Sequence, residues 1–119
     1  MTSTWSALTL DERPPSIASA TAAPDPVEPR PDDGDRDATT FAMTSSERGR
    51  LRVVIYRYAS TTVVRVLVSG TQAAGRQRLS WTGKTSSGAW LRGTFSYVIE
   101  ATDAADNTSR SRRHRIRVR

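Results

Sequence analysis

Cysteine is absent from the chain, and histidine occurs once, at position 114. Without cysteine, neither a disulfide framework nor a thiolate metal site can form. His114 stands in an arginine-rich segment with no carboxylate near it in the sequence, and no serine lies in a Gly-x-Ser-x-Gly motif, so a Ser-His-Asp triad is not predicted. The glycine spacing matches neither a P-loop nor a dinucleotide-binding fingerprint. These absences predict a protein that is not an enzyme.

Long apolar runs are also missing. No segment approaches the ~20 apolar residues of a membrane-spanning helix. The first residues lack the basic region and apolar core of a signal peptide, so we expect any export signal to lie outside this chain. No segment shows a sustained 3.6-residue apolar period, which predicts little or no helix.

Positive charge is abundant but unevenly distributed. The chain has 18 basic residues, all but one of them arginine, against 12 acids. Residues 1–47 carry a net charge of −6 and residues 48–119 a net charge of +12. A basic half can attract polyanions. Because its arginines alternate with apolar residues instead of clustering, they indicate solvated strand faces, with weak polyanion contact and no specific nucleic acid.

Period-two alternation is clearest in residues 93–102. Phe95, Tyr97 and Ile99 fall on one face of this segment, whereas Ser96 and Glu100 fall on the other. This pattern is typical of a strand that covers a core with one face. Similar alternation predicts strands at 39–45, 51–58, 61–68 and 112–119. A shorter strand is expected at 76–81, and a weak first strand at 14–23, where Ile17 is the one large apolar residue. Short strands at this spacing, separated by turn residues, indicate an antiparallel β-sandwich.

The inward phase of these strands predicts the core. Besides Phe95, Tyr97 and Ile99, we expect burial of the residues Val53, Ile55, Val64, Val66, Trp81 and Ile116. The opposite phase predicts outward arginines at positions Arg52, Arg65, Arg78, Arg113, Arg115, Arg117 and Arg119.

Glycines and short polar residues mark the connections. Gly83 and Gly88 are expected to hold tight turns with positive φ. Gly93 begins a strand near a bulky tryptophan, which predicts a close backbone approach. In the turn at 103–107, Asp106 or Asn107 can adopt the left-handed conformation.

An acidic, proline-rich segment occupies residues 24–37, with four prolines and six acids. Proline removes backbone donors, so an extended loop is expected. Asp33, Asp35 and Asp37 alternate there and could converge on Ca²⁺, which prefers oxygen ligands. The EF-hand pattern is not met, because Ala38 and Thr44 stand where its Gly and Glu would be. The alternative is a solvated acidic loop without metal, and no other cofactor is expected.

Three motifs together carry a family resemblance. Trp81-Thr-Gly83 is followed by Gly88 and then by the stretch Gly93-Thr-Phe-x-Tyr-x-Ile-x-Ala-x-Asp-Ala-Ala-x-Asn107. This pattern resembles the Ig-like domain of the bacterial flagellar hook-capping protein family. Similar modules occur in tandem in secreted bacterial surface proteins and behind subtilisin-like protease domains. The segment 24–37 is similar to the family's Asp-Pro-rich entry and 67–75 to its central hairpin loop, so the resemblance covers about residues 24–118.

The resemblance implies an all-β, Ig-like (fibronectin-III-like) antiparallel β-sandwich of about seven strands. Residues 14–119 would form this domain, and residues 1–13 would be the remnant of a preceding domain or a disordered N-terminus. The implied function is a non-catalytic structural or adhesive module of an exported bacterial surface or extracellular protein, acting as a spacer or an assembly contact. Its partners would be neighbouring Ig-like domains or other surface proteins. The alternatives are a fragment of a flagellar hook-capping assembly factor and a basic polyanion- or nucleic-acid-binding β-domain.

Overall fold

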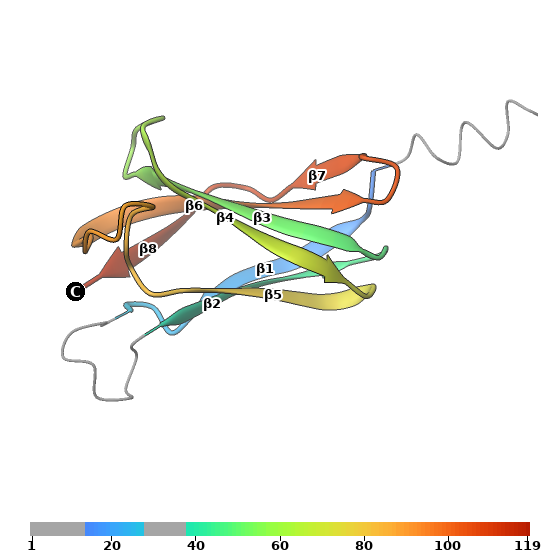
Figure 1. Cartoon of the computed structure of the whole chain (residues 1–119), viewed down its shortest axis with the longest axis horizontal. Coiled ribbons are helices and arrows are strands. Elements are labelled where there is room, and N and C mark those ends of the chain that lie inside the picture. The colour runs from blue at the N-terminus through green and yellow to red at the C-terminus, as the bar shows by residue number, and fades with distance from the viewer. Residues whose placement is uncertain (1–13, 28–37) are drawn as a thin grey trace, which may run out of the picture.

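Eight strands form two antiparallel sheets in the computed structural model, which describes residues 14–27 and 38–119 (Figure 1). The strands are β1 (Ile17–Ala23), β2 (Thr39–Ser45), β3 (Gly49–Arg57), β4 (Val63–Gln72), β5 (Gly75–Trp81), β6 (Gly93–Asp103), β7 (Thr108–Arg110) and β8 (His114–Val118). One sheet has the order β1-β2-β5; the other has the order β4-β3-β6-β7, and β8 also pairs with β6. The predicted all-β, Ig-like sandwich is confirmed. No helix of the described residues is long and apolar enough to cross a membrane.

The predicted strands correspond to observed ones, and β2 has the predicted bounds. The additional strand is β7, which has only three residues, Thr-Ser-Arg. It contains no apolar residue, so its sequence offers no alternation to detect. The expected loop at 69–75 is also shorter than predicted, because β4 continues to Gln72 and β5 begins at Gly75.

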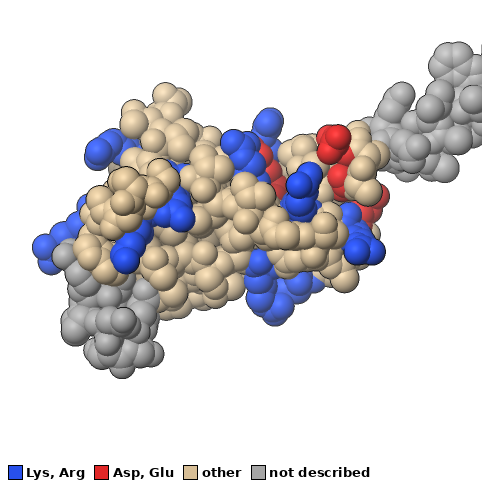
Figure 2. All heavy atoms as spheres, in the orientation of Figure 1, with Lys and Arg blue, Asp and Glu red and all other residues tan. Residues whose placement is uncertain are grey.

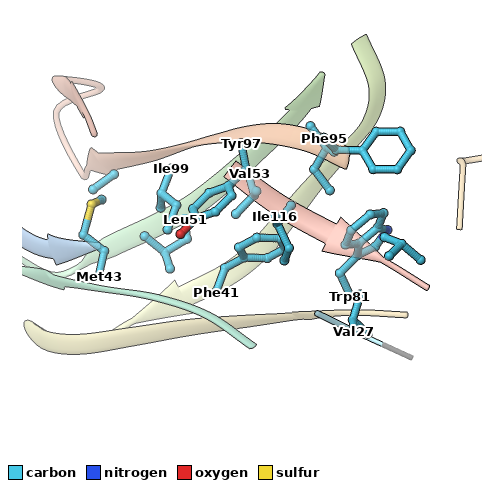
Figure 3. Packing of buried hydrophobic residues seen from close by; sticks show 13 residues of the cluster. Val27, Phe41, Met43, Leu51, Val53, Trp81, Phe95, Tyr97, Ile99 and Ile116 are labelled. Carbon is cyan, nitrogen blue, oxygen red and sulfur yellow. The ribbon is translucent and has the colours of Figure 1, made fainter. Parts of the chain in front are cut away.

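The core is centred on aromatic rings from both sheets (Figure 3). The Phe41 ring of β2 lies 6.1 Å from the Trp81 ring of β5 and 4.8 Å from the Tyr97 ring of β6, measured between centroids. Trp81 also donates an indole hydrogen bond to the Lys84 carbonyl at 2.9 Å, so its polar atom is satisfied. Predicted burial is confirmed for Val53, Ile55, Trp81, Phe95, Tyr97, Ile99 and Ile116.

The predicted phase of β4 is wrong beyond its first residues. The register with β3 pairs Ile55 with Arg65 and the next residue, Tyr56, with Val63, so Val64 is an extra residue in β4. Such a bulge reverses the alternation. Val64 is half-buried against the core, but Val66 is 38% exposed and Val68 60% exposed.

Arg65, expected to face solvent, instead lies on the inner phase of β4 and is half-buried. Its guanidinium donates hydrogen bonds to the carbonyls of Thr85 at 2.6 Å and Lys84 at 3.3 Å. The side chain therefore attaches β4 to the loop between β5 and β6.

Gly93 and Gly49 differ in how closely a neighbouring backbone approaches them. Gly93, predicted as a close backbone approach, has a φ of 115°, and a Cβ there would meet no atom within 4 Å, so that prediction is wrong. The close approach occurs at Gly49, where a Cβ would overlap the backbone carbonyl of Thr102 on the neighbouring strand β6. The positive φ predicted at Gly83, Gly88 and Asp106 is confirmed.

Gly49→Ala should destabilise the sandwich, because the added methyl group meets the Thr102 backbone, which cannot move without disturbing the β3–β6 ladder. We expect a loss of about 1–3 kcal/mol in the free energy of unfolding, measured by urea denaturation. Gly70→Ala on β4 is the matched control, because a Cβ at Gly70 meets no atom within 4 Å and no loss is expected there. Equal stability of both variants would contradict the packing described at Gly49.

Candidate protein-interaction surface

The residues predicted as a possible calcium site, Asp33, Asp35 and Asp37, lie outside the described residues, as does the segment 1–13. Within 14–27 and 38–119, no group of three or more His, Cys, Asp or Glu side chains could hold a metal ion. The calcium site therefore stays a prediction from the sequence.

His114, the single histidine, lies at the edge of the core. It is half-buried and pairs with Tyr97 across β6 and β8, with its ring stacked 5.4 Å from the tyrosine ring at an interplanar angle of 26°. Burial, together with the negative charge of Asp25, raises the pKa of the Tyr97 hydroxyl to about 12. The phenol is thus neutral at physiological pH, and the histidine acts as a packing partner at the edge of the core.

The outer face of the five-stranded sheet carries an apolar row that crosses three strands. The register places Val66 of β4 opposite Val54 of β3, and Val54 opposite Val98 of β6. All three point away from the core, because their sequence neighbours on each strand point inward. Val54 is buried by its neighbours, Val98 is half-buried and Val66 is exposed. We call these three residues the valine row.

A second row lies on one side of the valine row and contains the residues Val68, Arg52, Glu100 and Arg110 in order across β4, β3, β6 and β7. The Glu100 carboxylate accepts hydrogen bonds from Arg52 Nη1 at 3.0 Å and from Arg110 Nε at 2.8 Å. Burial raises the pKa of this carboxyl, but the hydrogen bonds and charges of Arg110 and Arg52 outweigh burial and hold the pKa below its ordinary value. Glu100 therefore stays ionised and fixes both arginines on the face.

A third row lies on the other side and contains the residues Val63, Tyr56, Ser96 and Arg115. Arg113, just before β8, reaches over this row: its guanidinium lies 4.2 Å from the centroid of the Tyr56 ring and donates to the Ser60 carbonyl at 2.7 Å. Arg115 lies 6.0 Å from the centroid of the Tyr58 ring. The contact with Tyr56 holds the Arg113 guanidinium against the sheet, whereas the contact of Arg115 is with a ring in the turn after β3.

The resulting face is graded. Its β4 side is aliphatic, and its β7 and β8 side is cationic, with Glu100 as the acid between them. Sequence reasoning missed this arrangement because it placed Val66 in the core and treated the arginines as independent solvated charges. The predicted outward exposure of Arg52, Arg78, Arg113, Arg115, Arg117 and Arg119 is confirmed.

The outward arginines divide between the two sheets. Arg78 belongs to β5 of the three-stranded sheet, whereas Arg52 and Arg115 belong to the five-stranded sheet. Figure 2 accordingly shows basic side chains on both the upper and the lower side of the molecule. The positive charge of residues 48–119 therefore does not form one continuous patch.

The fold is shared with parts of known bacterial proteins. No family model matches the sequence, and no curated protein matches it significantly. Among solved structures, dimeric latent PorU from Porphyromonas gingivalis matches with a TM-score of 0.67 at 15% identity, over 89% of this chain and 9% of PorU. FlgD from P. aeruginosa matches with a TM-score of 0.56 at 24% identity, over 68% of this chain and 62% of FlgD.

A second FlgD, from Xanthomonas campestris, whose structure was described for its role in hook capping, matches with a TM-score of 0.59 at 16% identity. That match covers 85% of this chain and 67% of the FlgD chain. The resemblance to the hook-capping Ig-like module is thus confirmed for the fold. This chain spans less than a tenth of PorU and about two thirds of each FlgD.

Glu100→Gln should reduce stability in a pH-dependent way. The folded pKa of Glu100 lies below its unfolded value of about 4.3; its ionised form therefore stabilises the fold above that pH, and this contribution disappears as the pH falls through the folded pKa. At pH 7 we expect a loss of about 1–3 kcal/mol in the free energy of unfolding, which shrinks towards zero as the pH falls through the folded pKa of Glu100. Urea denaturation across pH measures this loss. Glu47→Gln, at an exposed carboxylate, is the control, and a loss at Glu100 that did not vary with pH would contradict the ion-pair account.

Proposed function

We propose that the chain is a non-catalytic structural or adhesive module of a larger exported bacterial protein, in which it acts as a spacer or as an assembly contact. The main support is the match with PorU, which covers nearly all of this chain but only 9% of PorU. In PorU, this fold is therefore one small part of a long chain. A module of this kind contributes a stable shape and a surface instead of chemistry.

The path of the chain through the sandwich suits a spacer. Pro15 lies beside β7, where its carbonyl accepts a hydrogen bond from the Ser109 hydroxyl at 2.6 Å. The C-terminal strand β8 runs to the opposite end of the sandwich (Figure 1). Segments attached at Pro14 and Arg119 would thus be held apart by the length of the sheets.

A fragment of a hook-capping assembly factor is the second candidate. The observation in its favour is that the sandwich corresponds to about two thirds of each FlgD chain, a much larger share than for PorU. The structure of the X. campestris protein was described in terms of hook capping essential for flagellar assembly. Both candidates place the module outside the cytoplasm and assign it no reaction.

Location in the source bacterium tests the proposal. Antibodies raised against the purified chain should label intact cells, and protease added to intact cells should remove the antigen while a cytosolic marker stays intact. Enrichment of the antigen in purified flagellar hooks would select the hook-capping candidate over the general surface module. An antigen found only in the cytosolic fraction would overturn both.

Binding to nucleic acid distinguishes these functions from the basic β-domain. We expect weak oligonucleotide binding that falls steeply with salt, because arginine–phosphate contacts release counterions and do not read bases. The measurement is a fluorescence titration of single- and double-stranded oligonucleotides at about 0.15 M salt, where the Debye length is about 8 Å. Submicromolar affinity that survives this salt concentration would instead support a polyanion-binding domain.

A further inference from the structure

We propose that the outer face of the five-stranded sheet docks an acidic protein partner, one that presents an aliphatic ridge beside a row of carboxylates. The inference rests on the proposed function, because it assigns the assembly contact to one surface and names the chemistry of its partner.

The aliphatic half of the face is the first argument. The solvent side of an antiparallel sheet is ordinarily polar. Here each of the three rows begins on β4 with an exposed valine: Val63 at 49%, Val66 at 38% and Val68 at 60%. The valine row continues from Val66 through Val54, which is buried by its neighbours, to Val98, which is half-buried, across strands about 4.8 Å apart. Contiguous outward apolar residues of this kind mark interaction sites.

The cationic half is the second argument. Arg52, Arg110, Arg113 and Arg115 stand on this face; Glu100 lies between Arg52 and Arg110, and Asp25 lines a hollow with Arg115 and Arg117 at the β8 side. Arg110 uses only its Nε for Glu100 and has a side chain that is 69% exposed, so its two amino groups can still receive a carboxylate. Arginine offers a fork of donors that matches a carboxylate, and tyrosine and arginine are enriched at the centres of interfaces. The excess of positive charge calls for an acidic partner.

The edges of the five-stranded sheet at β8 and β4 do not suit the addition of a partner strand. A partner strand needs a regular, open edge. At β8 the edge is taken by Val27, whose N–H donates to the Arg117 carbonyl at 2.9 Å and whose carbonyl accepts from the Arg119 N–H at 3.0 Å. At the other edge, β4 carries one bulge at Val64 and a second register shift between Val68 and Thr71. Recognition is therefore expected through side chains and not through added backbone pairing.

Two other occupants fit less well. A second copy bound through the same face would set arginines against arginines if the two-fold axis ran across the strands, and arginines against valines if it ran along them; neither arrangement brings carboxylates to the arginines. Single-stranded nucleic acid would stack its bases on open aromatic rings. The Tyr56 ring, on β3, is instead covered by Arg113, and Tyr58, which is 53% exposed, lies in the turn after β3 and not on a strand of this face. An acidic protein surface with an aliphatic centre uses both halves of the face.

Three matched helical peptides test the proposal. The first has a leucine stripe flanked by glutamates, the second the same stripe flanked by lysines, and the third a serine stripe flanked by glutamates. In NMR titrations of the ¹⁵N-labelled chain at about 0.15 M salt, the first peptide should shift the amide signals of Val54, Val66 and Val98. The other two peptides should bind with an affinity that is lower by a factor of at least about ten. Equal binding of the serine–glutamate peptide, or shifts confined to other surfaces, would overturn the proposal.

Substitutions in each half of the face test whether both the valines and the arginines contribute to peptide binding. Replacing Val66 and Val68 together by threonine keeps β-branched side chains but removes apolar surface, and Arg115→Gln removes one cation; each should weaken the leucine–glutamate peptide about tenfold. Arg78→Gln on the other sheet is the charge-matched control and should leave binding unchanged. Melting curves show whether each variant is folded. Unchanged binding in folded variants would overturn this inference alone, whereas a cytosolic location of the antigen would overturn the proposed function independently of it.

Discussion

The packing of aromatic rings between the two sheets is the constraint on which the rest of the structure depends. In many sandwiches of this type a disulfide joins the sheets beside a buried tryptophan. This chain has no cysteine, so apolar burial must hold the sheets together without a covalent link. Phe41 does so from β2, because its ring contacts Trp81 in its own sheet and Tyr97 in the opposite one. Fully buried aliphatic side chains from β3, β6 and β8 enclose this centre.

Strand β6 connects the core to the candidate surface. It pairs with β3 on one side and with β7 and β8 on the other, so both of its edges are paired. Tyr97 and Ile99 point into the core, and the residues that alternate with them, Val98 and Glu100, therefore point outward. Because a one-residue slip would exchange these two faces, the packing that fixes Tyr97 inside also fixes the valine row and the acid that holds Arg52 and Arg110. The surface is as well defined as the core beneath it.

The outer face of the five-stranded sheet has features that an assembly contact needs and a spacer does not. A spacer needs only solubility on its outer surfaces, for which scattered arginines would suffice. This face instead combines exposed valines with arginines that are held by Glu100 and by tyrosine rings. Holding charged side chains in place reduces the entropy lost when a partner binds. Such preorganisation favours a specific contact with a complementary acidic surface, and it fits a module that works by association.

The alternation in the sequence determined where most strands lie and which face of β2, β3, β6 and β8 is buried, because an inward side chain every second residue is a local property of an extended backbone. The positive φ of Asp106 was also predictable from the local sequence, because aspartate in a short turn tolerates the left-handed conformation. Tertiary structure decided the rest. The valine row joins Val66, Val54 and Val98, which come together only through the order of strands in the sheet. The bulge at Val64 depends on the register with β3, and it reverses the side chains of β4 from Arg65 to Val68. The sequence alone indicates a solvated residue at Glu100, and only the pairing of β6 with β3 and β7 brings Arg52 and Arg110 to its carboxylate.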